Sequence, residues 1–151
     1  MPAVIRRLGP ADVALGWRLV HDLKRGAVSE SYVARLLGAP ANFLFAALAG
    51  ETPVGFLLAH RLDRLPEERP HFFIYELEVA ERFRRQGLGR GLIEALLTEA
   101  RREDAAAFVI ALASNQAALR LYAATGAEVK EKGSVVLLYP RAATPAGSGG
   151  C

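Results

Sequence analysis

The stretch Y-E-L-E-V-A-E-R-F-R-R-Q-G-L-G, at residues 75–89, is the first of two motifs that decide how this chain folds. The second motif reads S-N-Q-A-A-L-R-L-Y at 114–122 and is followed by a glycine at 126. Their patterns predict a strand, a glycine turn, a helix, a second strand and a second helix, in that order. This succession is typical of a mixed α/β domain.

The glycine turn at 84–90 has the composition of an anion-binding site. Glycines at a strand-to-helix turn remove side chains that would keep a ligand away from the backbone. The first turn of the following helix offers unpaired N–H groups at the positive end of its dipole, and Arg84, Arg85 and Arg90 add charge. The turn lacks the lysine of a Walker loop, and Leu92 stands where a dinucleotide fingerprint has its third glycine. Taken alone, the pattern also fits an ordinary helix start.

The second motif places two polar side chains on one face of a helix. Asn115 begins the predicted helix, and Tyr122 follows seven residues later, about two turns away. Both side chains can therefore face one cleft. Each residue also has a plainer interpretation, since asparagine is a common N-cap and a tyrosine can be a core residue whose hydroxyl bonds to the backbone.

The remaining elements are predicted from periodicity and turn residues. Residues 3–8 read as an opening strand, helices follow Asp12 and Ser29, and strands at 43–48 and 54–59 form a hairpin. Alternation along the strand at 72–79 puts Tyr75, Leu77 and Val79 on one face and the two glutamates on the other. The later expectations are a helix from Leu88 to Arg102, a central strand at 108–112, a helix at 115–125, and closing strands at Val129 and Val135–Tyr139.

Bulk properties narrow the class of protein. The chain has 151 residues, a net charge of +3 and one cysteine, Cys151. We expect one domain at 1–140 and a flexible tail at 141–151, with no disulfide framework and no metal site. No apolar run reaches the roughly 20 residues that span a bilayer, and no extended basic face with aromatics indicates nucleic-acid binding. A cytoplasmic protein without a membrane or nucleic-acid partner is the expectation.

The two motifs together resemble the GNAT superfamily of acyl-CoA-dependent N-acyltransferases. The resemblance implies a twisted, mostly antiparallel central sheet of six to seven strands with about four helices. In that fold the fourth and fifth strands splay apart and form the acyl-CoA cleft. The co-substrate would be acetyl-CoA. The residues implied to bind it are Leu77, Val79, Arg84, Arg85, Gln86, Gly87, Leu88, Gly89, Arg90, Asn115 and Tyr122.

A narrower likeness concerns the substrate. The stretch L-P-E-E-R-P-H-F-F-I-Y-E-L-E-V-A at 65–80 looks like the type I aminoglycoside 3-N-acetyltransferases, in which Glu76 would take the place of an aspartate. Two departures stand out: Glu78 replaces a small residue, and the family's late acidic segment is here V-V-L-L-Y-P-R at 135–141. The likeness implies a cationic aminoglycoside as partner, acetylated at the 3-amine of 2-deoxystreptamine.

The chemistry requires a base for the amine and a donor for the departing thiolate. Glu76 is the first choice for the base and Glu78 the second, acting directly or through water. Some GNAT enzymes have their base on the fifth strand, but the apolar strand at 108–113 contains no acid here. Tyr122 would protonate the thiolate, and a backbone N–H near Val79 would bind the oxyanion of a direct attack.

Acidic side chains are also expected to bind the substrate, and the residues assigned to this role are Glu67, Glu68, Glu76 and Glu78. His60 and His71 flank the same loop as Glu67 and Glu68, and each is a substrate contact, a secondary base or an ordinary surface histidine.

Two other functions stay open. One is a GNAT enzyme for another amine, such as a polyamine, an amino acid or a protein N-terminus, because acidity attracts any polycation. The other is a non-catalytic acyl-CoA sensor, against which the joint presence of Glu76, Asn115 and Tyr122 argues. Closing strands that pair between two copies would give a homodimer.

Overall fold

The computed structural model describes residues 2–24 and 26–141. Apart from residue 141, the predicted tail and its cysteine lie outside the described residues. The strands and α-helices follow one another as β1 (Val4–Arg7), α1 (Val13–Leu19), α2 (Glu30–Gly38), β2 (Asn42–Ala49), β3 (Thr52–Leu62), β4 (His71–Val79), α3 (Leu88–Arg102), β5 (Ala106–Val109) and α4 (Gln116–Ala124). The mixed α/β fold expected from the sequence is confirmed.

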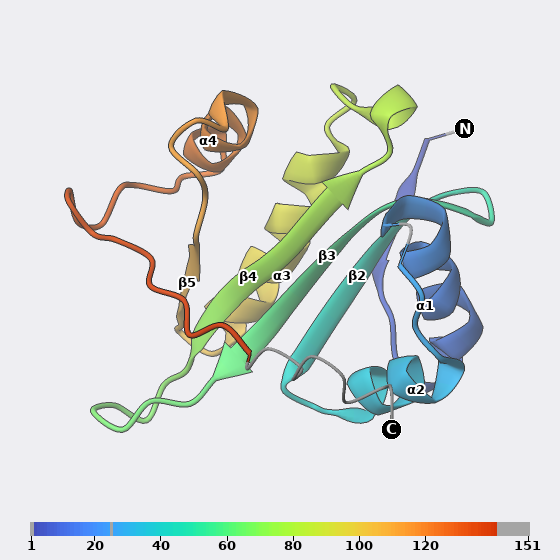
Figure 1. The fold of residues 1–151 in the computed structure, drawn as a ribbon, viewed down its shortest axis with the longest axis horizontal. Coiled ribbons are helices and arrows are strands. Elements are labelled where there is room, and N and C mark those ends of the chain that lie inside the picture. The colour runs from blue at the N-terminus through green and yellow to red at the C-terminus, as the bar shows by residue number, and fades with distance from the viewer. Residues whose placement is uncertain (1, 25, 142–151) are drawn as a thin grey trace, which may run out of the picture.

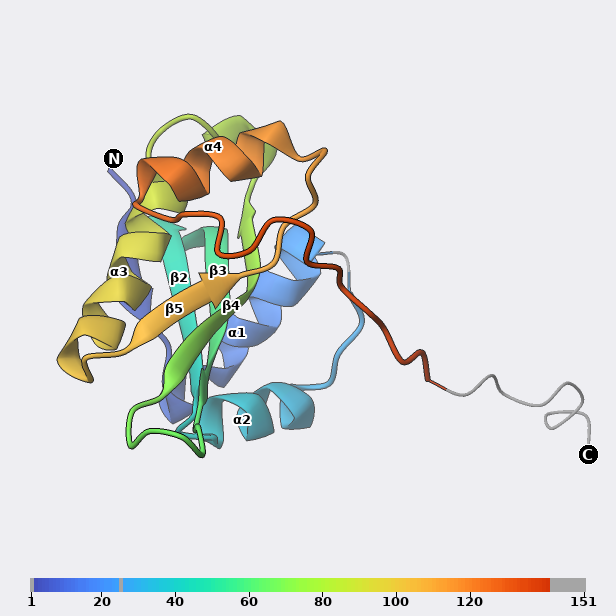
Figure 2. The same ribbon diagram turned by 90° about the vertical axis from the view of Figure 1, so that its left-hand side faces the viewer.

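The sheet lies between two helical layers (Figures 1 and 2). Its strand order is β1-β2-β3-β4-β5, with antiparallel pairing up to β4 and parallel pairing between β4 and β5. Helix α3 covers one face and α1 and α2 cover the other, as Figure 2 shows edge-on. The prediction of a mostly antiparallel sheet is therefore confirmed.

Alternation along the strands divides the interior into two cores. Phe43, Phe45 and Leu57 face α3 and pack with its Leu92 and Leu96. The intervening strand residues face the other way and pack with the first two helices, in a second core built from Leu8, Leu19, Val33, Leu37, Leu44, Ala46, Phe56 and Leu58. Each buried leucine or phenylalanine contributes about 1.5–3 kcal/mol by leaving water, so both faces of the sheet are anchored.

Local signals explain where the helices on the second face begin and how closely they approach. Ser29 caps α2, because its hydroxyl oxygen accepts the backbone N–H of Tyr32 at 3.1 Å. A Cβ on Gly16 of α1 would lie 2.9 Å from Cγ1 of Val33, so the glycine permits close contact between α1 and α2. The predicted hairpin is confirmed as β2 and β3, which turn at Gly50 with a φ of +64°.

Two predictions for the end of the chain are wrong. The apolar run at 108–112 was expected as a central strand, but only its residues 108 and 109 belong to β5, which ends at Val109. β5 is also the last strand in the sheet order and not a central one. The closing strands expected at Val129 and Val135–Tyr139 are absent from the described residues, so the sheet has five strands and not six or seven. The side chains of Val135–Tyr139 are 70–95% exposed. An unbroken apolar run forms a strand only beside a partner, and no described strand lies along this one.

Candidate active site

The fourth and fifth strands separate halfway along β4. Their parallel pairing runs from His71 opposite Ala106 to Ile74 opposite Val109, whereas β4 continues to Val79. Past Ile74, no strand of residues 2–24 or 26–141 pairs with β4 on that side. The predicted splay of these strands is confirmed. The backbone of the second half of β4 is thereby left open to a ligand that can pair with it.

A β-bulge marks the point where the strands separate. Across β3 and β4, Leu58 lies opposite Glu76, but the next residue, Ala59, lies opposite Ile74. Tyr75 is the extra residue, and it reverses the alternation along β4. Leu77 therefore packs against the core under α3, while Tyr75 and Glu76 line a pocket on the other face. The prediction that Tyr75 shares a face with Leu77 and Val79 is wrong for this reason.

The glycine turn joins the end of β4 to the start of α3. Gly87 has a φ of +80° and Arg85 a φ of +61°, which bend the chain sharply before Leu88 begins the helix. Nε of Arg84 donates a hydrogen bond to the carbonyl oxygen of Val79 at 3.1 Å. The side chains of the turn are exposed or half-buried. The sequence predicts a phosphate site at this turn, and Arg84, Arg85 and Arg90 are exposed in the structure.

Helix α4 is held against the start of α3. A Cβ on Gly89 would lie 3.0 Å from Cδ2 of Leu121, so the missing side chain admits α4 at this point. Asn115 is the N-cap of α4, with its Oδ1 accepting the N–H of Ala118 at 3.1 Å. The plainer interpretation of Asn115 is thus confirmed, and coenzyme A binding by this residue stays a prediction.

Tyr122 follows Leu121 on α4. Its side chain is half-buried and packs against the core under α3. Burial raises the pKa of the Tyr122 hydroxyl, because the phenolate would lose hydration there. The hydroxyl is therefore protonated at neutral pH and can donate a hydrogen bond.

A pocket of about 290 Å³ opens on the face of the sheet that carries α1 and α2. Glu76 lines it from β4, and the other walls come from α2 and the adjoining ends of β2 and β3. The full lining consists of Tyr32, Arg35, Leu36, Ala39, Asn42, Leu58, His60, Tyr75 and Glu76. Glu78 lies on the same face of β4, opposite Phe56 of β3, and does not line this pocket. Glu76 and His60 were among the candidates predicted from the sequence, whereas Asn42 and the residues of α2 were not.

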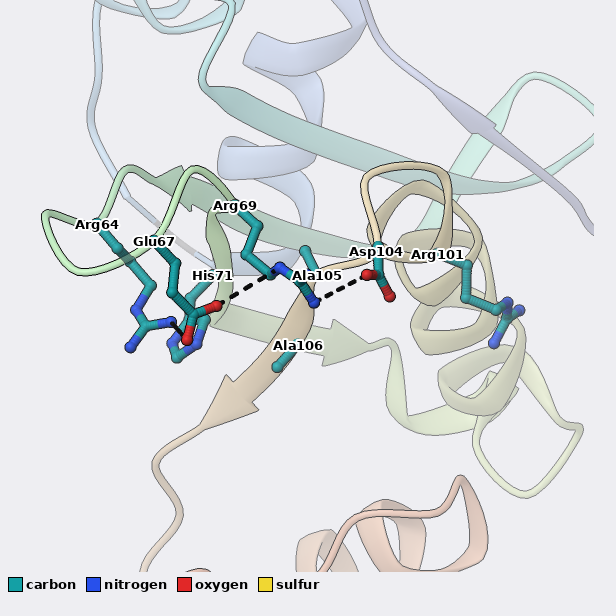
Figure 3. Close-up of a pocket in the computed structure, with 8 residues that line it drawn as sticks. All are labelled: Arg64, Glu67, Arg69, His71, Arg101, Asp104, Ala105 and Ala106. Carbon is teal, nitrogen blue, oxygen red and sulfur yellow. Dashed lines mark ion pairs between the residues drawn. The ribbon is translucent and has the colours of Figure 1, made fainter.

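A larger pocket, of about 440 Å³, lies at the start of β4, beside His71 (Figure 3). Four of its charged side chains form a chain of ion pairs: Glu67 contacts Arg64 and Arg69 at 3.5 Å each, and Arg69 reaches Asp104 at 2.8 Å. Glu67 thus lies in a different pocket from Glu76, and Glu68 lines neither. The structure does not bring the four predicted substrate-binding glutamates together.

No helix within 2–24 or 26–141 has the length and apolar character needed to cross a membrane. In the same part of the chain, no group of three or more His, Cys, Asp or Glu side chains is arranged to hold a metal ion.

Solved structures with this architecture include aminoglycoside acetyltransferases. HMB0005, from an uncultured soil metagenomic sample, is 27% identical, with 95% of this chain and 100% of that chain covered and a TM-score of 0.81. The enzyme meta-AAC0020, also from a soil metagenomic sample and in complex with sisomicin, is 26% identical over 93% of this chain and 97% of that chain, with a TM-score of 0.82. AAC(6')-Iy, in complex with a bisubstrate analogue, is 23% identical over 94% and 100%, with a TM-score of 0.75, and this likeness shows the fold alone.

A search of curated proteins found no match. Comparison with protein families does identify the family of this chain. Residues 16–127, which include the pocket on the α2 side, the splayed strands, the glycine turn and α4, match the acetyltransferase (GNAT) family. The chain therefore belongs to the acetyltransferase (GNAT) family.

Proposed function

We propose that this acetyltransferase moves the acetyl group of acetyl-CoA directly to an amine of an aminoglycoside, at the 3-amine of 2-deoxystreptamine. One observation carries the proposal: β4 presents Glu76 to a pocket at the point where it leaves β5, and the arginine-glycine turn follows the end of the same strand. A base for an amine and a site for a pyrophosphate would thus lie on one continuous segment of the chain. Likeness to two soil aminoglycoside acetyltransferases supports the choice of substrate.

The residues of the turn fit the pyrophosphate of acetyl-CoA. Helix N–H groups and the charges of Arg84, Arg85 and Arg90 would bind it, with Gln86 and Leu88 contributing backbone contacts. The open backbone of β4 between Leu77 and Val79 would pair with the amide groups of the pantetheine arm. Asn115 would approach the same arm from the start of α4.

Glu76 would act as the base. An ammonium group cannot attack a thioester, so the carboxylate takes its proton directly or through water, and the freed amine attacks the thioester carbonyl. A backbone N–H near Val79 would stabilise the oxyanion of the tetrahedral intermediate. Glu78 is the second candidate for the base because it shares the face of β4 with Glu76.

Tyr122 would stabilise the departing thiolate. Burial holds the pKa of its hydroxyl above the ordinary value of ~10, whereas a thiol has a pKa of ~8.5. Complete proton transfer from Tyr122 to the thiolate therefore runs uphill. A hydrogen bond from the hydroxyl to the developing thiolate requires no such transfer, and we assign this role to Tyr122.

The acceptor would be held mainly by Glu76, with Glu78 beside it. Glu67 is paired with two arginines, so its contact with substrate would require exchange of those ion pairs. Arg35 on the pocket rim favours a second candidate acceptor, an amine that also carries an anionic group, such as a short peptide.

Release of free thiol from acetyl-CoA, measured with gentamicin, spermidine and a short peptide as separate acceptors, tests the proposal. Turnover with gentamicin supports it. Turnover confined to spermidine or the peptide assigns the enzyme another amine. Tight acetyl-CoA binding without turnover on any acceptor favours the non-catalytic sensor.

A further inference from the structure

A chain of two hydrogen bonds determines which nitrogen of His60 carries its proton. Nδ2 of Asn42 donates to the carbonyl oxygen of Leu36 at 2.9 Å, and Oδ1 of Asn42 lies 2.8 Å from Nδ1 of His60. A carbonyl only accepts, so the amide nitrogen of Asn42 must face Leu36. The amide oxygen therefore faces His60 and also only accepts. It follows that Nδ1 of His60 is the donor and bears the hydrogen.

The neutral imidazole then has a lone pair on Nε2. A neutral histidine protonated at Nδ1 presents Nε2 as an acceptor. His60 and Asn42 are directly opposite each other on β3 and β2, and both line the pocket that contains Glu76. The ring of Tyr75 meets the imidazole edge-on, with centroids 5.7 Å apart. Asn42 and Tyr75 thus hold the histidine from two sides.

The position of His60 relative to Glu76 sets a spacing. Glu76 lies opposite Leu58, and His60 is two residues further along β3 on the same face. Residues paired diagonally in this way on neighbouring strands lie about 7–8 Å apart. A ligand in this pocket would meet a carboxylate and a neutral nitrogen acceptor that project from strand positions about 7–8 Å apart.

We propose that Nε2 of His60 accepts a hydrogen bond from a second N–H or O–H group of the acceptor substrate while Glu76 engages the amine to be acetylated. His60 is then a specificity residue that selects acceptors carrying a second donor group beside the amine to be acetylated. The inference rests on the proposed function in so far as the pocket receives the acceptor. Arg35 also lines the pocket, so the pocket already contains one positive and one negative side chain. A neutral acceptor such as Nε2 adds a hydrogen bond to the substrate without adding a second negative charge.

A matched pair of variants separates this role from a structural one. In His60→Asn the amide nitrogen stands on Cγ as Nδ1 does, so the donor to Asn42 is kept and the acceptor at Nε2 is lost. In His60→Gln the amide lies at the position of Nε2, so an acceptor is kept and the contact with Asn42 is lost.

We expect His60→Asn to raise KM for gentamicin about tenfold, with KM for acetyl-CoA and Tm close to wild type. We expect His60→Gln to lower Tm and to leave KM for gentamicin nearer to wild type. The opposite order of KM values, or wild-type KM in both variants, overturns the proposal.

Nitrogen NMR of the full chain tests the proposal without turnover. The sequence has three histidines, and the His60→Asn spectrum identifies the signals of His60 by subtraction. At about pH 8 we expect a protonated Nδ1 and an unprotonated Nε2. Addition of gentamicin should shift the Nε2 signal. A proton on Nε2, or an Nε2 signal that responds to neither gentamicin nor spermidine, overturns the inference even if an amine is acetylated. A correct tautomer and a shifted signal without turnover contradict the proposed function and not the role of His60.

Discussion

Nε of Arg84 donates a hydrogen bond to the carbonyl oxygen of Val79 at 3.1 Å, which ties the basic turn to the last residue of β4. The strand that carries Glu76 and the turn assigned to the pyrophosphate are therefore positioned by one another. A bound acetyl-CoA would have its thioester and its pyrophosphate located by a single continuous segment, residues 76–90. Substitutions in the turn test its contribution to acetyl-CoA binding, and substitutions in the strand test its contribution to turnover.

Arg84→Gln should weaken acetyl-CoA binding about tenfold, because it removes both the charge facing the pyrophosphate and the contact with Val79. The Kd for acetyl-CoA, measured by calorimetry at low and high salt, checks this expectation, and the difference from wild type should shrink as salt screens the charge. Arg101→Gln, at the other end of α3, removes the same charge far from the turn and serves as the control. Equal weakening by both variants would point to a general effect of net charge.

Gly87→Ala tests the conformation of the turn. Because the φ of Gly87 is +80°, a Cβ at this position should cost about 1–2 kcal/mol of stability. It should also raise the Kd for acetyl-CoA by distorting the N–H groups of the first helical turn. Gly87→Asn is the matched variant, since asparagine tolerates the left-handed region, and it should recover most of both losses. Chemical denaturation and acetyl-CoA titration of the two variants measure the effect, and an alanine variant as stable as wild type contradicts it.

Glu76→Gln should lower kcat by about 10²–10⁴-fold while leaving the Kd for acetyl-CoA nearly unchanged, because it removes a base and leaves the turn intact. Steady-state kinetics with gentamicin and acetyl-CoA titration provide both values. Glu78→Gln is the comparison, and its smaller effect on kcat would reflect charge in the cleft. A larger loss in Glu78→Gln than in Glu76→Gln would transfer the role of base to Glu78.

Tyr122→Phe should lower kcat about tenfold, since it removes one hydrogen bond to a charged atom and water can take its place. Turnover at saturating acetyl-CoA and gentamicin measures this loss. Wild-type turnover in the phenylalanine variant would remove Tyr122 from the mechanism.

The raised pKa of Tyr122 also predicts how stability depends on pH. The folded-state pKa lies above the unfolded value of ~10, so the contribution of the neutral hydroxyl is complete below pH ~10 and is lost as pH rises through the folded-state pKa. Wild-type stability should therefore fall more steeply than that of Tyr122→Phe above pH ~10. Thermal unfolding of both proteins between neutral and alkaline pH checks the sign, and parallel curves would contradict it.

Much of the fold is legible in local patterns. Helix α3 has the predicted bounds, Leu88–Arg102, because its apolar residues repeat at helical spacing and glycine marks its start. The hairpin of β2 and β3 follows from two apolar runs around Gly50. These signals depend on residues close in sequence, and so a single sequence contains them.

Features that depend on partners distant in sequence were harder to predict. The bulge at Tyr75 is a property of the register between β3 and β4, and it reverses a face assignment that simple alternation made wrongly. The pairing of Asn42 with His60 likewise requires the register of β2 and β3. The run Val135–Tyr139 is as apolar as a strand, but strand formation requires a neighbour that composition does not reveal.

The product of the reaction tests the central claim most directly. The protein is incubated with acetyl-CoA and gentamicin, free coenzyme A is quantified, and the purified aminoglycoside is analysed by mass spectrometry and NMR. The proposed function predicts one acetyl group per molecule, on the 3-amine of 2-deoxystreptamine, with one coenzyme A released for each. Unmodified gentamicin contradicts the aminoglycoside assignment, and an acetyl group on a different amine contradicts the proposed position of transfer.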